Sequence, residues 1–258
     1  MPDAVRDFYD HLAGGYHLMF EDWESSMARQ AAALGPILER ECGAAASVRV
    51  LDCACGTGTQ SLGLARRGFH VTGADLSSGA IERARVEASQ RRLDLPLYVA
   101  DMRQLSGLPE TGFDAVIAMD NALPHLLSDP DLRQAAAQIR GKLKDGGIVM
   151  ASIRDYDQLM LERPVVQGPA FFSDGGRRRI VFQLWDWKDE RRYRFHLYIT
   201  RETAAGWETH HDAAEYRCVR RDELGRILSD AGFTDVRWLM PPDTGFYQPI
   251  VLAKSTSH

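Results

Sequence analysis

The chain has 258 residues, of which 45% are hydrophobic and 26% charged, values typical of a globular protein with a substantial core. This composition excludes a disordered or fibrous chain, and the formal net charge of -5 argues against a general nucleic-acid-binding protein. No apolar run is long enough to cross a membrane and no signal-peptide core is found near the start, so we expect a cytoplasmic protein without membrane partners.

The first segment, residues 4–42, is predicted to be helical because large apolar side chains recur in it at a spacing of three to four residues. From residue 48 onward, strands alternate with helices. The expected strands are VRVLDCA, FHVTGAD, LYVAD, FDAVIAMD and GIVMASIRD, and glycine-terminated or serine-capped helices separate them. Such alternation is typical of parallel βαβ units, and it predicts an α/β fold with a doubly wound sheet.

This alternation ends near residue 160. Residues 178–200 alternate apolar and polar side chains around the charged sequence KDER, which predicts a hairpin, and residues 206–219 continue as one or two strands. A helix and two strands follow. We therefore expect one domain with a small antiparallel β insert that covers the mouth of the sheet. The expected parts of this domain are an N-terminal helical segment at residues 1–45, the cofactor-binding core at 46–160, the insert at 161–218, and the final helix and strand pair at 219–258.

Four cysteines are too few for a disulfide scaffold in a chain of this length. Cys53 and Cys55 form a C-x-C pair, and the other two are isolated, so we interpret all four as reduced thiols. No second pair of cysteines or histidines has zinc-ligand spacing, and we expect no metal.

Polar residues end each of the five predicted parallel strands, at the edge where open α/β sheets bind ligands. Any one of them alone is explained by a turn, a helix cap or packing. Their recurrence at successive strand ends indicates a site. Asp75 stands where a carboxylate can accept hydrogen bonds from ribose hydroxyls, and Asp101 with Met102 suits the edge and face of a purine. The fourth strand ends at Asp120, and the fifth ends at Arg154.

The glycine pattern discriminates between nucleotides. A dinucleotide site requires G-x-G-x-x-G, with the pyrophosphate at a helix N-terminus. Here Gly56 and Gly58 are followed by Ser61, and the carboxylate of Asp52 would repel a pyrophosphate. A carboxylate instead suits an ammonium group, which favours S-adenosylmethionine, a ligand with adenosine, an amino-acid tail and no phosphate.

The stretch VLDCACGTGTQSLGLARRGFHVTGADLS resembles the first two motifs of class I S-adenosylmethionine-dependent methyltransferases, although Ala54 replaces a usual glycine, and YVADMRQL resembles the motif around the adenine. Within this class the chain is similar to the glycine/sarcosine N-methyltransferase group. The matching parts are Tyr9, Tyr16, Trp23 and Arg29 near the start, DNALPHL at 120–126 and RDYD at 154–157. The resemblance covers about residues 8–160, and it implies a Rossmann-like, seven-stranded, mostly parallel sheet with an N-terminal helical lid.

The resemblance also implies S-adenosylmethionine as cofactor, S-adenosylhomocysteine as product, and a role for each matching residue. Asp75 would hold the ribose, Arg29 would pair with the cofactor carboxylate and Trp23 would exclude water. The residues so assigned to the cofactor are Tyr9, Tyr16, Trp23, Arg29, Ala54, Gly56, Gly58, Asp75, Leu76, Asp101, Met102 and Met119.

The acceptor side departs from the glycine-specific enzymes. Asn121 and Arg154 match positions that meet the amine side and the carboxylate of glycine there. The usual patterns are glycine-asparagine-serine and arginine-asparagine-tyrosine, whereas residues 120–122 read Asp-Asn-Ala and residues 154–156 read Arg-Asp-Tyr. Two acidic replacements favour a small-molecule acceptor other than free glycine, such as a heterocyclic intermediate of secondary metabolism, azapteridines included. Tyr9, Trp185 and Tyr198 are further residues predicted to contact it.

The reaction would be an in-line methyl displacement, in which the enzyme aligns the two reactants and excludes water. A neutral amine needs no base, whereas a more acidic acceptor would need one. The predicted catalytic residues are therefore Asp120 or His125 as the base and Tyr156 or Tyr9 as the group that holds the acceptor.

Several alternatives remain open. An O-methyltransferase or a glycine/sarcosine N-methyltransferase would share this fold. A dehydrogenase is disfavoured by Asp52 and the missing third glycine. A binding protein without turnover, or a protein or RNA methyltransferase, is also compatible with the motifs, although we expect no nucleic-acid partner because the run Arg177–Arg179 is interpreted as a solvated turn. Oligomeric state is left open.

Overall fold

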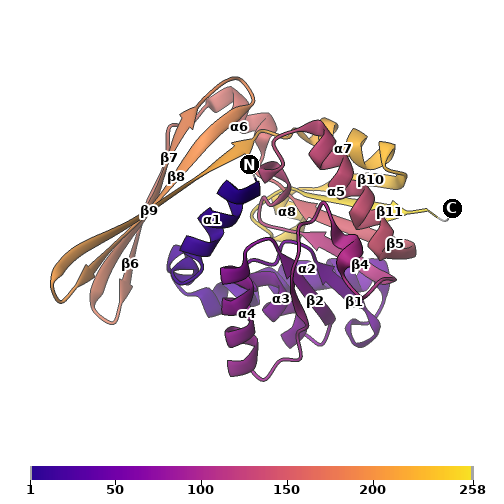
Figure 1. Ribbon diagram of the computed structural model, residues 1–258, viewed down its shortest axis with the longest axis horizontal. Coiled ribbons are helices and arrows are strands. Elements are labelled where there is room, and N and C mark those ends of the chain that lie inside the picture. The colour runs from indigo at the N-terminus through magenta and orange to yellow at the C-terminus, as the bar shows by residue number, and fades with distance from the viewer. Residues whose placement is uncertain (1, 257–258) are drawn as a thin grey trace.

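The computed structural model describes residues 2–256 and contains two β-sheets, of which the larger is covered by helices on both faces (Figure 1). The N-terminal part is helical, as predicted. It comprises α1 (Pro2–Leu12), the short 3₁₀ helix η1 (Tyr16–Met19) and α2 (Trp23–Cys42). The side chain of Asp22 caps α2 by accepting a hydrogen bond from the Ser25 amide.

The larger sheet has seven strands in the order β10-β11-β5-β4-β1-β2-β3, and it confirms the predicted doubly wound α/β fold. Only β11 runs antiparallel to its neighbours. The strands are β1 (Arg49–Asp52), β2 (His70–Asp75), β3 (Leu97–Val99), β4 (Phe113–Ala118), β5 (Leu143–Ser152), β10 (Phe233–Leu239) and β11 (Ile250–Ser255). The principal helices around them are α3 (Thr59–Arg66), α4 (Ser78–Gln90), α5 (Asp129–Lys142) and α7 (Arg221–Asp230). Shorter helices are α6 (Tyr156–Glu162) and α8 (Pro241–Thr244).

Strand order reverses between β1 and β4, the place where ligands bind in sheets of this kind. All six residues of β4 are buried, as expected for a central parallel strand with both faces covered. The carboxyl ends of β1 to β5 therefore form one edge, and the loop that leads into the antiparallel β11 reaches the same edge.

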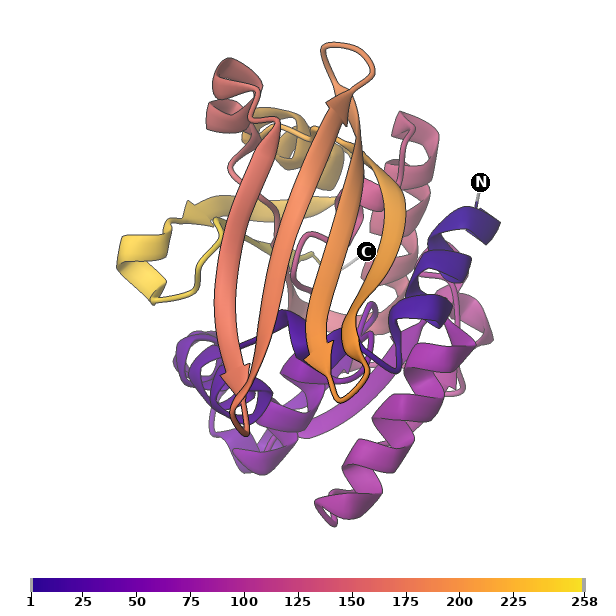
Figure 2. The ribbon, with the colours of Figure 1, turned by 90° about the vertical axis from the view of Figure 1, so that its left-hand side faces the viewer.

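The second sheet is antiparallel, in the order β6-β7-β8-β9. Its strands are β6 (Val166–Asp174), β7 (Arg177–Trp187), β8 (Arg192–Thr203) and β9 (Gly206–Arg217). The predicted hairpin around KDER is the β7–β8 pair, whereas β6 has no counterpart in the sequence prediction. In Figure 2 these long strands lie in front of the larger sheet, with α1 packed beside β9.

The interpretation of Arg177–Arg179 as a solvated turn is wrong for Arg179. These residues begin β7, and alternation of side chains across the strand turns Arg179 to the inner face, where it is 3% exposed. The neighbouring Arg178 points outward and pairs with Glu202.

Two hydrophobic clusters lie on opposite faces of the larger sheet. One joins α2, α3 and α4 to the sheet, and it includes Trp23. The other holds Trp185, Tyr193, Phe195 and Tyr156, so the inner face of the second sheet belongs to the same core as the larger sheet.

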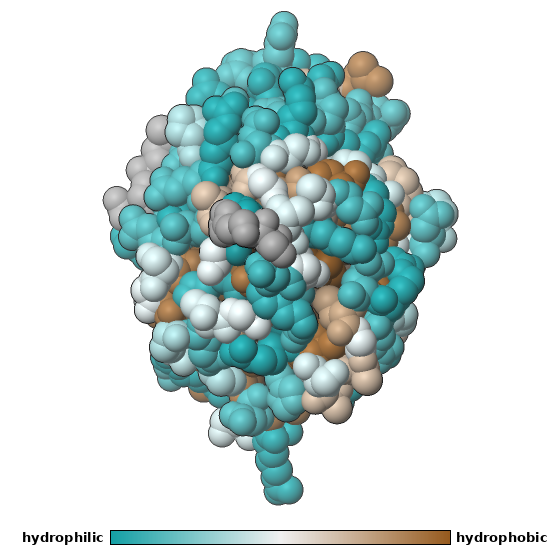
Figure 3. Space-filling model, turned by 90° about the vertical axis from the view of Figure 1, so that its right-hand side faces the viewer, coloured by the Kyte–Doolittle hydropathy of each residue, from teal (hydrophilic) through white to brown (hydrophobic). Residues whose placement is uncertain are grey.

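The side of the molecule opposite the second sheet is mainly hydrophilic, with apolar side chains in small separate groups (Figure 3). No helix between residues 2 and 256 is long and apolar enough to cross a membrane. All four cysteines are unpaired.

Candidate active site

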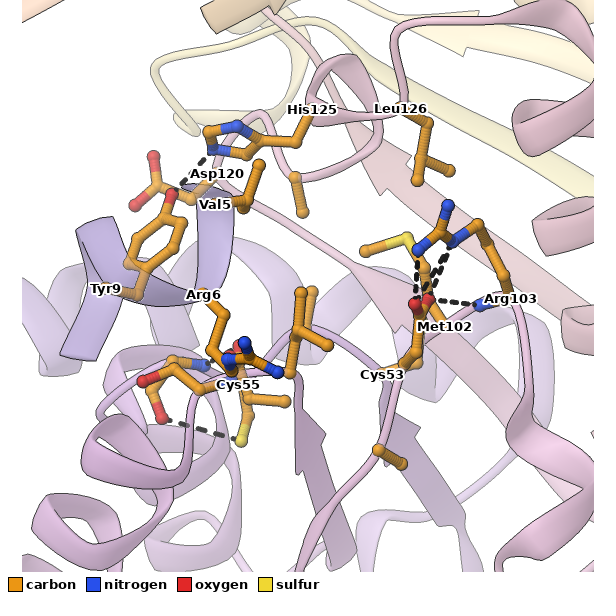
Figure 4. Close-up of a pocket in the computed structure, with 18 of the residues that line it drawn as sticks. Val5, Arg6, Tyr9, Cys53, Cys55, Met102, Arg103, Asp120, His125 and Leu126 are labelled. Carbon is orange, nitrogen blue, oxygen red and sulfur yellow. Dashed lines mark hydrogen bonds and ion pairs between the residues drawn. The ribbon is translucent and has the colours of Figure 1, made fainter. Parts of the chain in front are cut away.

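A cavity of about 410 Å³ opens at the carboxyl ends of β1 to β4 and is closed on one side by α1 (Figure 4). Val5, Arg6 and Tyr9 of α1 face the sheet across it. Most of the residues predicted for the cofactor line this cavity: Tyr9, Tyr16, Ala54, Gly56, Asp75, Leu76, Asp101, Met102 and Met119. The polar ends of the second, third and fourth strands, Asp75, Asp101 and Asp120, thus line one cavity, whereas Asp52 and Arg154 from the first and fifth do not border it.

The loop after β1 shapes one wall of this cavity. Gly56 has a φ of 52°, and a Cβ there would have no atom within 4 Å, which leaves room for a ligand. Its amide donates a hydrogen bond to Asp75 Oδ2 at 2.8 Å, and the Ser77 amide donates to Asp75 Oδ1 at 2.9 Å. These bonds fix the carboxylate plane and leave further lone pairs for ligand hydroxyls.

Gly58 has a different role, since it does not line the cavity. It is the left-handed N-cap of α3, with a φ of 97°, and a Cβ there would meet the Leu62 side chain at 3.0 Å. Asp52 also lies beneath the loop and is 1% exposed. One of its oxygens accepts a hydrogen bond from Ser61 Oγ at 2.7 Å, and burial raises its pKa to about 7.

Arg103 fixes the third strand end. Its guanidinium donates to both carboxylate oxygens of Asp101 and reaches Asp131 at 2.8 Å. Burial opposes ionisation of Asp101, but these hydrogen bonds outweigh it and hold the pKa of Asp101 below its usual value. Asp101 therefore faces the cavity as a carboxylate in a defined orientation.

Trp23 and Arg29 do not reach the cavity. Trp23 is buried between α2 and α3, where its Nε1 donates to Thr59 Oγ1 at 2.9 Å. Arg29 is exposed on α2. The resemblance implies a cofactor role for both residues, but α2, which begins at Trp23, contributes no residue to the lining of this cavity.

A second cavity, of about 520 Å³, lies under the inner face of the second sheet. Arg154 and Asp155 from the end of β5 line it, together with Gln183 of β7 and Phe195 of β8. Tyr9, Tyr16 and Asp120 line both cavities and form the wall between them.

Asp120 stands at this junction in a left-handed backbone conformation, with a φ of 58°. Its amide donates to Ser152 Oγ at 2.7 Å, and Ser152 Oγ in turn donates to Gln248 at 2.8 Å. The carboxylate accepts hydrogen bonds from the hydroxyls of Tyr16, at 3.3 Å, and Tyr247. Asp120 is thus held by both its backbone and its side chain.

His125 contacts Tyr9 across the first cavity, with Nε2 2.9 Å from the Tyr9 hydroxyl (Figure 4). Its ring lies 4.1 Å from that of Tyr216. Burial, assisted by the positive charge of Arg154, lowers the pKa of His125 to about 3. The imidazole is therefore neutral at physiological pH and a weak base.

Arg154 lies among aromatic rings, 4.7 Å from the Trp185 ring and 5.2 Å from that of Tyr216. Its Nη1 donates to the Tyr193 hydroxyl at 2.7 Å. No carboxylate within residues 2–256 forms an ion pair with it. It faces the second cavity as a cation with neutral partners.

Four residues predicted to meet the acceptor line neither cavity. Asn121 and Tyr156 are buried behind Arg154, where Asn121 Nδ2 donates to the Tyr156 hydroxyl at 2.9 Å. Trp185 is 2% exposed and stacks on Tyr193 at 4.4 Å. Tyr198 lies on the outer face of β8, stacked on Phe182, because it has the opposite strand parity from Tyr193. Asn121, Tyr156 and Trp185 are therefore placed to position Arg154. Tyr198 is not placed to contact the acceptor.

Sequence reasoning missed Tyr247 and Gln248, which lie in the loop before β11. A usable signal existed in the topology. A last strand antiparallel to β5 must begin at the edge where β5 ends, so the loop before it borders the site. In the described part of the chain, no group of three or more histidine, cysteine or acidic side chains could hold a metal ion.

Comparison with known proteins agrees with this geometry. A family described as a methyltransferase domain matches residues 50–147. The glycine/sarcosine N-methyltransferase of Aphanothece halophytica is 28% identical over 200 residues, covering 73% of this chain and 67% of that protein. The same enzyme from Parasynechococcus marenigrum (strain WH8102) is 35% identical over 162 residues, covering 62% and 57% of the two chains.

Among solved structures, Streptomyces venezuelae DesVI superposes with a TM-score of 0.75 at 20% identity, covering 99% of this chain and 98% of that one. The sugar N-methyltransferase KedS8 from Streptoalloteichus sp ATCC 53650 gives a TM-score of 0.74 at 17% identity, covering 90% and 88%. At these identities the likeness concerns the fold. Together with the strand-end motifs and the sequence relatives, it places the chain in the class I S-adenosylmethionine-dependent methyltransferases.

Proposed function

We propose that this methyltransferase transfers a methyl group to a nitrogen of a small molecule, with the cofactor in the first cavity and the acceptor in the second. The carrying observation is the shared wall: Tyr9, Tyr16 and Asp120 border both cavities. Two reactants in adjoining cavities meet at one point, which is what a direct displacement requires.

The lining of the first cavity suits S-adenosylmethionine. The oriented carboxylate of Asp75 would accept hydrogen bonds from the ribose hydroxyls, and Asp101 with Met102 would meet the adenine. Ala54 and Gly56 would leave space for the methionine part. When bound, the cofactor supplies an electrophilic methyl group on a sulfonium.

The junction residues suit an amine acceptor. The Asp120 carboxylate can accept a hydrogen bond from an amine N–H and so direct the nitrogen lone pair toward the first cavity. A neutral amine requires no prior loss of a proton, in keeping with the weak basicity of His125. We assign His125 to holding the Tyr9 hydroxyl.

Arg154 would bind an anionic group of the acceptor. It faces the second cavity, and within the described residues its hydrogen-bond partners are neutral. The volume of about 520 Å³ exceeds the needs of glycine. This favours a larger metabolite, such as an intermediate of secondary metabolism, over the glycine/sarcosine alternative. The structural neighbours described as methylating an amino pentose and a sugar nitrogen are compatible with such an acceptor.

Calorimetric titration with S-adenosylhomocysteine tests the cofactor assignment. We expect Asp75→Ala to weaken binding about 30-fold or more, because two charge-assisted hydrogen bonds are lost. Asp94→Ala, which alters an exposed carboxylate elsewhere, should leave the affinity unchanged. Equal affinity of the Asp75 variant would remove this residue from the site, and no binding by the unaltered protein would overturn the cofactor pose.

A panel of primary and secondary amines and matched alcohols, analysed by mass spectrometry with S-adenosylmethionine, tests the acceptor. We expect a mass gain of one methyl group or more on amines that carry an acidic group. Transfer to the alcohols alone would establish the O-methyltransferase alternative.

A further inference from the structure

Arg179 is a buried cation that no part of the proposed chemistry uses. It is 3% exposed on the inner face of β7, in contrast to Arg178 beside it, whose side chain is 67% exposed. Its Nε donates to Asp174 Oδ2 at 2.7 Å and its Nη2 donates to Asp174 Oδ1 at 2.9 Å. This bidentate pair within the β6–β7 hairpin fixes the plane of the guanidinium.

The remaining donors of Arg179 reach the N-terminal segment. They donate to the carbonyl of Leu18 and, at 3.1 Å, to the carbonyl of Phe20. These carbonyls stand at the C-terminal end of η1, where a short helix leaves its last acceptors without helical partners. A buried arginine from the second sheet therefore caps the C-terminal end of η1, a helix of the N-terminal lid.

This helix supplies part of the junction. It begins at Tyr16, whose hydroxyl donates to Asp120 at 3.3 Å and whose side chain borders both cavities. On the same face of β7, Gln183 borders the acceptor cavity and Arg154 Nη2 lies 3.5 Å from its side-chain oxygen. Strand β7 thus contacts the acceptor cavity at one point and the lid at another.

We infer that Arg179 is a positioning residue for methyl transfer: it joins the second sheet to η1 and thereby holds Tyr16 against Asp120 at the junction of the two cavities. The expected effect on methyl transfer rests on the proposed function. The expected effect on the position of η1 rests on the geometry alone. Lysine at position 179 keeps the charge but cannot bond Asp174 and both carbonyls in one plane.

The kinetic test compares Arg179→Lys with Arg178→Lys, the same change at the exposed neighbour. We expect the first to lower kcat about tenfold, since a small displacement at a reacting centre is costly, and the second to leave kcat unchanged. The affinity for S-adenosylhomocysteine should fall less than kcat, because the ribose and adenine contacts lie elsewhere. Asp174→Asn, at a half-exposed carboxylate, gives a milder version of the same defect if the lysine variant folds poorly.

A double-mutant cycle with Tyr16→Phe distinguishes positioning from general destabilisation. If Arg179 acts through Tyr16, Arg179→Lys should lower kcat less than twofold in the Tyr16→Phe background. Multiplicative losses, or equal kcat values for the two lysine variants, would overturn the inference.

Hydrogen exchange provides a readout that does not depend on activity. Arg179→Lys should speed exchange of amides in residues 16–20 while exchange in the β1–β5 core stays unchanged. Unchanged exchange at residues 16–20 would refute the proposed contact between Arg179 and η1, even if methyl transfer is never detected. Absence of methyl transfer by the unaltered protein would refute only the proposed function.

Discussion

At the scale of single residues, the site depends on groups whose surroundings set their ionisation. His125 and Asp52 are both buried beside the first cavity, yet burial acts on them in opposite senses, because it always disfavours the charged form. The imidazole is kept neutral, and the carboxyl group retains its proton to higher pH.

For His125, we expect no titration between pH 5 and 8, since its pKa of about 3 lies below this window. NMR of the imidazole C–H signals would check this, with His125→Gln identifying the resonance by its loss. A resonance that disappears in the variant and shifts with pH in that window would reinstate His125 as a candidate base.

For Asp52, the folded pKa of about 7 lies above the ordinary value of 3.8, which applies to the unfolded chain. Because this pKa is raised, the contribution of Asp52 to stability is fully present below pH 3.8 and is lost as the pH rises through 7. This loss amounts to roughly 2 to 3 kcal/mol between pH 5 and 8. The free energy of unfolding, measured in urea at several pH values, should fall less across this range for Asp52→Asn than for the unaltered protein. If the two proteins lose the same free energy with pH, Asp52 is not the group that ionises.

The acidic residues that sequence reasoning located without the family resemblance share one property: they end parallel strands. Asp75, Asp101 and Asp120 could be predicted because strand ends converge wherever the sheet forms. Tyr247 could have been located from the strand topology, because the loop before β11 borders the same edge. Arg179 could not, since its role arises from the contact of β7 with a segment distant in sequence. Trp23 and Arg29 were assigned to the cofactor from the family resemblance, and a resemblance in sequence does not reveal whether α2 borders the cavity in this chain.

At the scale of elements, α1 is fixed by three successive side chains that reach three different elements. Tyr9 contacts His125, Asp10 Oδ1 accepts hydrogen bonds from Ser77 Oγ at 2.5 Å and the Gly79 amide at 2.8 Å, and His11 lies 3.8 Å from Asp212 of β9. Asp10 thus joins the lid to the N-terminus of α4, where a carboxylate also complements the helix dipole.

We expect Asp10→Ala to cost about 1 kcal/mol of unfolding free energy, the usual effect of losing a helix cap. Because α1 closes the first cavity, S-adenosylhomocysteine should also dissociate several-fold faster. Stopped-flow displacement and urea unfolding measure the two effects. Asp7→Ala, on the exposed side of the same helix, serves as the matched control and should change neither.

Among the elements, β6 escaped prediction while β7 and β8 did not. The latter two alternate apolar and polar residues regularly, whereas β6 is largely exposed and carries a register shift between Gln167 and Ala170. Its sequence signal is the Gly175–Gly176 turn that pairs it with β7, with both glycines at positive φ. Turn chemistry, rather than hydrophobic alternation, identifies this edge strand.

At the scale of the whole molecule, the two sheets share a core. Trp185, Tyr193 and Phe195 of the second sheet belong to the cluster that also holds Leu123 and Val251 of the larger sheet region. We therefore expect a single cooperative unfolding transition, with tryptophan fluorescence and far-UV circular dichroism giving coincident curves in urea. Separate midpoints would mean that the insert unfolds as an independent unit.

The common wall of Tyr9, Tyr16 and Asp120 has a consequence for inhibition. Because the two cavities adjoin, one compound carrying an adenosine-like part and an amine-bearing acid on a short linker could occupy both. Once one half is bound, the other is presented to its cavity at high effective concentration, so such a bisubstrate ligand would bind far more tightly than either half alone.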